Sequence, residues 1–307
     1  MSQFSTKIVS DIDLCKELWA KFSPEKSIYD LWDFRFEFWK VFRYEPYFVV
    51  LSDAGEDVGL LPLWYVSDKE SYFWFGDVGD NNDWQEDNDL WVKNSGYLKP
   101  LIDNCPTPVK LFNLTADCFK RAGDSVQFQK HDPKNVLPID TFGSVEDYLM
   151  TLKGKLRGNL TKDRRTIEAQ DPVITIDHFQ DFDELIRLNI LRLEESYFKD
   201  PRIGRTFHGI INKGLEKESF QVRMLSAHID GKPAGFDFIL IYDDVYYPLL
   251  AAYDIAGFPG IGNYMTLYDI KDAISLGMRM MDFAEGAEDY YKNKLFPMIA
   301  QYKIEML

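Results

Sequence analysis

A glycine-rich hexapeptide in the second half of the sequence is the strongest local candidate for ligand binding. It reads Phe258-Pro259-Gly260-Ile261-Gly262-Asn263 and leads into a stretch with helical spacing, residues 263–276. Glycines let a backbone approach a ligand closely, and the first turn of a helix offers unpaired N–H groups to a phosphate. The hexapeptide therefore indicates a site for a phosphate-bearing ligand. Its other interpretation is a tight connection that glycine and proline only shape.

A basic segment precedes this hexapeptide in the same half of the chain. It holds one acid, Asp163, among the cations Lys153, Lys155, Arg157, Lys162, Arg164 and Arg165. Lys153, Arg157 and Arg164 are spaced to share one face of a helix. In a chain of net charge -15, such a face can contact the phosphates of a cofactor, a nucleotide-linked acceptor or tRNA. It can equally be a solvated helix surface.

The dipeptide Tyr291-Lys292, shortly after Gly286, is a third candidate. A lysine can pair with a phosphate or carboxylate, and a tyrosine can protonate a leaving group. The alternative is a lysine whose stem packs on an aromatic cluster while its ammonium stays in water.

A recurring order of elements must position these residues. The second half predicts helices, then three strands joined by tight turns, a loop, a helix and two further strands, at residues 221–229, 234–242, 245–253, 263–276, 279–283 and 299–306. The first half repeats nearly the same order. We therefore expect an α/β (α+β) fold of two tandem units, residues 1–142 and 143–307, each a mixed, mostly antiparallel sheet flanked by helices.

Composition limits the classes of function. The chain has 307 residues, is 46% hydrophobic and carries net charge -15, so a dedicated DNA-binding protein is not expected. Its three cysteines form no CxxC pair and its four histidines lie far apart, which disfavours a metal site. No apolar run approaches the ~18 residues of a membrane span, so the expected location is cytoplasmic.

Several short motifs in this order resemble the GNAT acyltransferase fold, and two such units in tandem resemble the FemAB-like acyltransferases. The resemblance covers residues 145–296 and rests on Arg157-Gly158-Asn159-Leu160, Asp230-Gly231-Lys232-Pro233, Ala252-Tyr253-Asp254, Pro259-Gly260, Asp282-Phe283 and Tyr291-Lys292. The first half matches only in element order.

The resemblance implies roles for these residues. It implies that Tyr253 and the loop Pro259, Gly260, Ile261, Gly262 and Asn263 hold the pyrophosphate of acyl-CoA, a co-substrate rather than a tightly bound cofactor. This loop lacks the basic residue with which the family pattern usually starts. The resemblance also places Tyr291 and Lys292 beside the acyl-transfer cleft, and we expect Lys153, Arg157, Arg164 and His208 on the substrate side.

Acyl transfer to an amine also needs an oxyanion donor and a proton acceptor. In this fold the donor is usually backbone N–H, here near residues 251–253. For the acceptor the sequence leaves several candidates open, namely Asp254, Glu285, Glu194 and His208.

The first half differs at the position of the phosphate loop. Residues 75–89 hold six acids and no base, which would repel a pyrophosphate. We expect a degenerate unit on the acceptor side, with Trp74, Trp84 and Trp91 as an apolar or sugar-stacking surface. A calcium loop is a distant alternative, because the required spacing is absent.

The sequence therefore predicts an N-acyltransferase that moves an acyl group from acyl-CoA, foremost acetyl-CoA, to an amine. The acceptor is a small molecule or a nucleotide-linked cell-envelope precursor. Two alternatives stay open: an aminoacyl-tRNA-dependent peptidyltransferase of peptidoglycan precursor synthesis, and a non-catalytic tandem GNAT binding protein.

Overall fold

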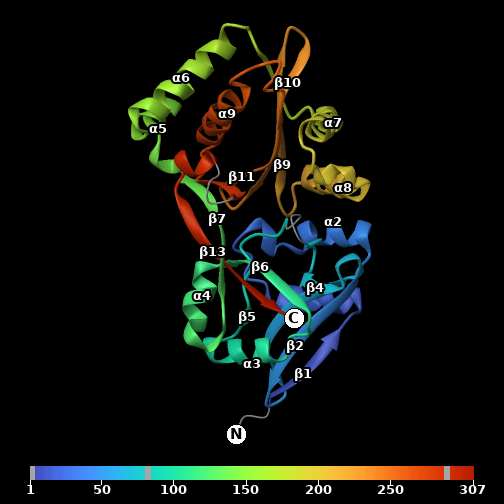
Figure 1. The fold of residues 1–307 in the computed structure, drawn as a ribbon. Helices are drawn as coiled ribbons and strands as arrows, with labels where there is room; N and C mark the ends of the chain where they lie inside the picture. Colours follow the sequence, from blue (N-terminus) through green and yellow to red (C-terminus); the bar gives the residue numbers. More distant parts are fainter. Residues whose placement is uncertain (1–3, 80–83, 287–290) are drawn as a thin grey trace. The chain divides into compact units, whose positions relative to one another are not determined.

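The computed structural model describes residues 4–79, 84–286 and 291–307. The chain divides into two compact units. Figure 1 shows its elements coloured along the sequence. Unit 1 comprises Met1–Pro133 and Ile299–Leu307, and unit 2 comprises Lys134–Met298. The last strand was expected in the second domain, but it pairs within unit 1, and unit 2 begins before the expected boundary at 142/143.

Unit 1 contains a largely antiparallel sheet in the order β1-β2-β3-β4-β6-β13. Within this order β4 and β6 are parallel. Its strands are β1 (Phe4–Val9), β2 (Glu45–Asp53), β3 (Glu56–Val66), β4 (Ser71–Trp74), β5 (Trp91–Val92), β6 (Val109–Thr115) and β13 (Met298–Met306). Its helices are α1 (Ile12–Phe22), α2 (Trp32–Phe42), α3 (Leu98–Asp103) and α4 (Ala116–Ala122).

Unit 2 arranges its strands in the order β7-β12-β11-β10-β9-β8. Here β11 and β12 are parallel. The strands are β7 (Gln129–Pro138, which begins in unit 1), β8 (Val173–Ile176), β9 (Gln221–Ile229), β10 (Lys232–Tyr242), β11 (Val245–Tyr253) and β12 (Met280–Glu285). The helices are α5 (Val145–Thr151), α6 (Gly154–Glu168), α7 (Phe182–Arg192), α8 (Pro201–Glu216) and α9 (Ile261–Ser275).

The meander of unit 2 follows from its turn residues. Asp230 and Gly231 have φ of 52° and 71°, and Asp243 and Asp244 have 48° and 57°. Aspartate and glycine tolerate this left-handed region, which two-residue hairpins need. The predicted hairpins are therefore confirmed, and with them the mixed, mostly antiparallel sheet.

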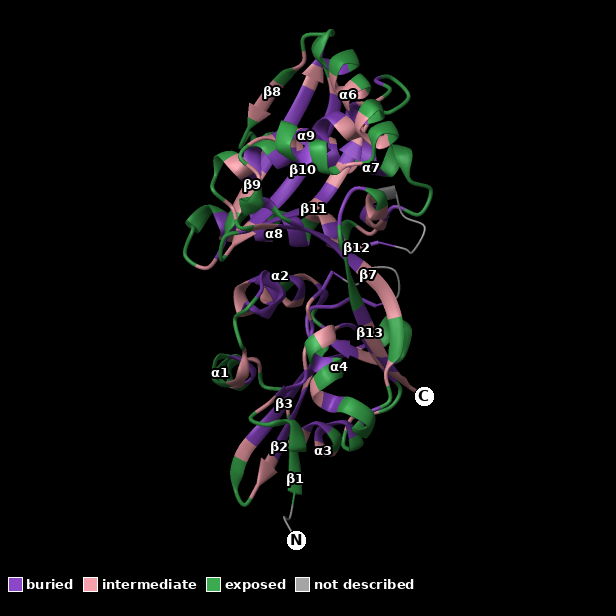
Figure 2. Ribbon diagram, turned by 90° about the vertical axis from the view of Figure 1, so that its left-hand side faces the viewer, coloured by how far each residue is buried: buried purple, intermediate pink, exposed green. Residues whose placement is uncertain are grey.

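Each unit has its own hydrophobic core. In unit 1, Val49, Leu61 and Leu111 belong to one cluster of buried side chains. In unit 2, Ile239 and Met265 belong to another, which brings β10 against α9. Figure 2 shows the buried residues of both units concentrated along their strands.

Candidate functional site

The parallel strands of unit 2 separate soon after they meet. Val245 pairs with Met280 and Tyr246 with Met281, and the register ends there although both strands continue. Beyond Tyr246, the backbone groups of β11 that face β12 have no ladder partner in the described strands. Such groups can donate hydrogen bonds to a developing oxyanion. The separation is thus a candidate place for a site that stabilises a developing negative charge.

A buried carboxylate lies on β10, the strand next to β11, where it pairs with Ala251. Asp237, in the middle of β10, is 1% exposed, and its Oδ1 accepts a hydrogen bond of 2.5 Å from the hydroxyl of Tyr253 at the end of β11. Burial raises the pKa of Asp237 to about 7, against the opposing effects of the Tyr253 hydrogen bond and the charge of Lys292. This carboxyl group therefore titrates near neutrality.

A second buried acid lies close to the first. Asp269 of α9 is 2% exposed, and burial followed by the charge of Asp237 raises its pKa well above the usual range. Lys292 acts electrostatically on both acids. Its Nζ lies 4.8 Å from the centre of the Phe283 ring, so the ammonium group itself contacts an aromatic ring. One cation thus serves two buried carboxyl groups.

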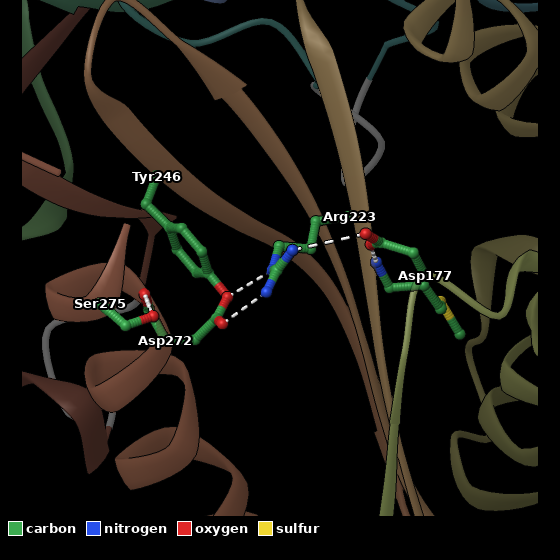
Figure 3. A network of polar contacts seen from close by, with 6 residues as sticks. Asp177, Arg223, Tyr246, Asp272 and Ser275 are labelled. Carbon is green, nitrogen blue, oxygen red and sulfur yellow. Dashed lines mark hydrogen bonds and ion pairs between the residues drawn. The ribbon is translucent and has the colours of Figure 1, made fainter. Parts of the chain in front are cut away.

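A separate polar network anchors α9 to the sheet (Figure 3). Arg223 of β9 donates to both carboxylate oxygens of Asp272, at 2.5 and 2.6 Å, and Asp177 lies 3.4 Å from its other side. The hydroxyl of Tyr246 donates to Asp272 at 3.0 Å. A bidentate pair of this kind has fixed geometry, so it sets the position of α9 against the sheet.

The glycines of the predicted phosphate loop are explained by contacts within the protein. Gly260, with φ of 96°, caps α9, and a Cβ there would meet the Cβ of Asp163 at 2.9 Å. A Cβ at Gly262 would meet the ring of Tyr253 at 3.2 Å. Asn263 donates to the Asp163 carboxylate at 2.6 Å. Close packing of α6 and β11 on α9 therefore accounts for both glycines.

The charge at this helix terminus does not suit a pyrophosphate. Asp163 places a carboxylate beside the first turn of α9, where an anion is already stabilised by the helix dipole. A second anion at the same place would be repelled. The backbone of the loop fits a phosphate but its charge does not, and Pro259 is exposed while Ile261 is buried.

The other predicted site residues lie in different places. Asp254 closes the turn that precedes α9, because its side chain accepts from the N–H of Gly257 at 3.0 Å. Glu285 is the last residue of β12, where its backbone pairs with Lys134 of β7. Tyr291 begins a short 3-10 turn, Tyr291–Lys294, that carries Lys292; Tyr290 lies outside the described residues.

The basic face splits in two. Lys153 precedes α6 and is exposed. Arg157 contacts the sulfur of Met150 and lines a concavity of about 640 Å³ along α6. Arg164 instead pairs with Glu146 at 2.9 Å and lines a concavity of about 540 Å³ against α9. His208, on α8, pairs with Asp183 at 3.0 Å and is not brought to Lys292 by any contact described here.

The expectations for unit 1 need correction. Trp74, Trp84 and Trp91 are 1%, 9% and 6% exposed, so they are core residues and present no stacking surface. In the acidic loop, Asp77 is fully buried, and Oδ1 of this side chain accepts from the N–H of Gly79 at 3.2 Å. Residues 80–83 lie outside the described part.

A buried arginine explains why this loop turns inward. Arg35 of α2 is 2% exposed and donates to the carbonyls of Tyr29 and Phe75 and, at 2.6 Å, to the side chain of Asn88. Burial lowers its pKa to about 10, so it stays charged at neutral pH. Asp77 acts on it electrostatically. Asp77 is therefore one acid of this loop that lies within electrostatic reach of a buried cation, as Asp30 outside the loop does.

Two residues of the site were missed by the sequence, Asp237 and Asp269. A signal for Asp237 existed: it is the one acid in the apolar run Ala234-Gly235-Phe236-Asp237-Phe238-Ile239. Buried acids in strands are rare unless they are paired or functional. Among the described residues, no group of three or more His, Cys, Asp or Glu side chains could hold a metal ion. Nor does any helix in the described ranges have the length and apolarity needed to cross a membrane.

Comparison with known proteins supports this picture. Residues 154–293 match the family model described as an acetyltransferase (GNAT) domain. No curated protein matches the sequence significantly. FemX shares the fold over 98% of this chain and 97% of its own, with a TM-score of 0.59 and 10% identity.

Two further solved structures are similar over nearly the whole chain. L-PGS from Bacillus licheniformis has a TM-score of 0.57 and 12% identity, covering 96% of this chain and 91% of its own. A tandem GNAT protein from the clavulanic acid biosynthesis pathway has a TM-score of 0.51 and 10% identity, covering 99% of this chain and 98% of its own. Residues 154–293 thus carry the match to the acetyltransferase (GNAT) domain model, which supports an acyltransferase, and the chain shares its overall fold with FemX and with a tandem GNAT protein.

Proposed function

We propose that unit 2 transfers an acyl group to an amine, with the reaction at the separation of β11 and β12. The observation that carries this proposal is the short register of these strands, two pairs long, beside the charged groups of Lys292 and Asp237. Unpaired backbone N–H groups of β11 stabilise the oxyanion. Buried acids below them suit an acceptor that arrives as an ammonium and must lose protons.

The first candidate donor is acyl-CoA, foremost acetyl-CoA, because the matched family is an acetyltransferase domain. The acyl carbon would lie at the strand separation. With Asp163 at the start of α9, we assign no role to the loop in holding the pyrophosphate. Lys292, which is partly exposed, is proposed to contact a donor or an acceptor carboxylate.

The second candidate donor is an aminoacyl-tRNA, as in the FemAB-like resemblance. Two observations favour it. The α9 terminus already holds a carboxylate, and the exposed side of α6 presents Arg157, Lys162 and Arg165 along one concavity. Phosphodiester groups bind such a face through interactions that weaken with salt. The acceptor amine would then belong to a cell-envelope precursor, as the sequence analysis anticipated. The first half is proposed to serve the acceptor side or the fold alone.

The test compares donors on the full-length protein. Acetyl-CoA and an aminoacyl-tRNA are each offered with a panel of primary amines that includes an amino sugar, an amino acid and a polyamine. N-acylated product is measured by mass spectrometry. Product with either donor supports the proposal and identifies the donor class. Absence of product with both donors, together with no change in thermal midpoint on adding either, would leave the binding-protein alternative.

A further inference from the structure

Tyr253 is held on Asp237 by the packing of its ring. A Cβ at Gly235 of β10 would meet the ring at 3.0 Å, and one at Gly262 of α9 would meet it at 3.2 Å. The ring therefore lies between two residues that have no side chains. This arrangement directs the hydroxyl to Oδ1 of Asp237, while Tyr253 as a residue stays partly exposed.

The second oxygen of Asp237 has no hydrogen-bond partner among the described residues. Oδ2 is buried and makes no hydrogen bond to any group that the structure describes, and the same holds for Oδ1 of Asp269. An acid kept only to tie β10 to β11 would cost free energy through its unsatisfied oxygen. Natural cores rarely keep such a group without a role, and perturbed carboxyl groups cluster at functional sites.

Resting on the proposed function, we propose that Tyr253 and Asp237 form the proton relay of the reaction. The acceptor ammonium first loses one proton to solvent, and the neutral amine nitrogen then attacks the acyl carbon, while the bond from that carbon to the leaving sulfur or oxygen breaks with its electron pair. The proton lost by nitrogen passes to the Tyr253 hydroxyl oxygen as the hydroxyl proton passes to Asp237. The leaving group takes a proton from water, and Asp237 returns its own to solvent after product departs.

This relay makes Tyr253 the catalytic residue and Asp237 a positioning residue that acts through it. Asp237 accepts a proton only while it is ionised. The groups that face it set its ionisation: Tyr253 and Lys292 favour the charged form, and burial opposes it. Tyr246 and Asp269 also lie within its electrostatic reach, and Asp272 next to them is paired with Arg223. With its pKa near 7, the relay gains activity as the pH rises through neutrality.

The experiment measures kcat/KM against pH for Tyr253→Phe and Asp237→Asn with the donor and amine that the wild-type protein uses. Both substitutions keep the shape of the side chain, and the amide of the second still accepts a hydrogen bond. General-base catalysis typically contributes about 10²- to 10⁴-fold. We expect kcat/KM to fall about 100-fold in each variant and no further in the double variant. The acidic limb, which is the decrease of kcat/KM as the pH falls through 7, should disappear.

Tyr44→Phe of unit 1 is the matched control, because it also removes a hydrogen bond from a tyrosine hydroxyl to an aspartate, here Asp68 at 2.5 Å. It should change the thermal midpoint and keep the acidic limb. If the wild-type protein turns over, both variants stay within threefold of its kcat/KM, and the fall of kcat/KM below pH 7 is unchanged, the relay is overturned and the proposed function stands. A wild-type protein that acylates no amine with either donor would overturn both. Should one variant not fold, the other decides by the same criteria.

Discussion

Each unit contains one pair of parallel neighbours among its described strands, and the two pairs end differently. In unit 1, β4 and β6 share the single register position Tyr72–Val109. Beyond it Asn88 forms a parallel bridge with Leu114, and its side chain donates to the carbonyl of Phe112 at 3.0 Å. In unit 1, Asn88 therefore pairs with β6 beyond the point where the register of β4 with β6 ends.

In unit 2, no described residue pairs with β11 on the β12 side beyond Tyr246, and Asp237 of β10 pairs with Ala251 in this part of β11. Arg35 of unit 1 satisfies its charge with three acceptors, whereas Asp237 and Asp269 of unit 2 each keep an oxygen that bonds to nothing described. A buried charged group that makes all its hydrogen bonds stabilises one conformation, whereas a buried polar atom without a hydrogen bond lowers the stability of the fold. Arg35 therefore has a structural role, whereas a chemical role for Asp237 rests on the relay proposed with Tyr253.

The largest expected effect is on the stability of unit 1. Arg35→Met removes the donor to Tyr29, Phe75 and Asn88 and leaves Asp77 without its cation. Breaking a buried charge network costs about 3–5 kcal/mol, so we expect an earlier unfolding transition in urea. The control is Arg43→Met, an exposed arginine over Trp39. Equal midpoints for the two variants would contradict the role of Arg35.

The second effect is a pH dependence of stability. Asp237 has a pKa of about 7 when folded and 3.8 as its ordinary value, so the folded protein binds the extra proton. Its stabilising contribution is complete below about pH 4 and disappears as the pH rises through 7. Asp237→Asn should therefore gain on the order of 2–4 kcal/mol relative to wild type between pH 5 and pH 8.5.

Thermal midpoints of both proteins at the two pH values measure this difference. Asp30 of unit 1 provides a comparison, because burial raises its pKa to about 6. Its stabilising contribution is therefore lost as the pH rises through 6, about one pH unit before that of Asp237. A constant difference between Asp237→Asn and wild type across the range would show that Asp237 does not titrate there.

The third effect concerns Lys292. Its charge lowers the pKa of Asp237, so Lys292→Met should raise that pKa and move the acidic limb of kcat/KM to higher pH. A charge-assisted bond to substrate is worth roughly 1.5–3 kcal/mol, or about 10- to 150-fold in rate. Lys294→Met, one residue beyond Asn293 and exposed, is the control. Full activity with an unmoved limb would remove Lys292 from the site.

The smallest effect separates the donors. Asp163→Asn removes the anion at the start of α9 and keeps a partner for Asn263. If acyl-CoA places its pyrophosphate there, the affinity for CoA in calorimetry should rise by a few-fold, as expected for a charge near a helix terminus. Asp171→Asn, after the end of α6, serves as the control. Unchanged affinity in Asp163→Asn places the pyrophosphate elsewhere.

The periodicity and turn residues of the sequence predict most elements of unit 2, because hairpins such as Asp230-Gly231 are local. The edge strand β1 was not predicted, since Phe4–Val9 is almost wholly exposed and shows no buried alternation. Nor could the sequence assign β13 to unit 1, because its pairing with β6 is between distant residues.

The candidate site shows the same limit. Gly260 and Gly262 were recognised as special, but the side chains that require them, Asp163 and Tyr253, come from other elements. Pattern reasoning could assign these glycines only to a ligand. The acid pair needs β10, α9 and Lys292 together, a convergence that no local spacing encodes.

The most direct test of the difference between the units is hydrogen–deuterium exchange of the full chain with acetyl-CoA and, separately, with an aminoacyl-tRNA. The account predicts that the productive donor slows exchange in residues 246–262 of unit 2 and leaves residues 72–79 and 84–92 of unit 1 unchanged. Protection confined to those unit 1 residues, with 246–262 unaffected, would contradict the assignment of acyl transfer to the β11–β12 separation.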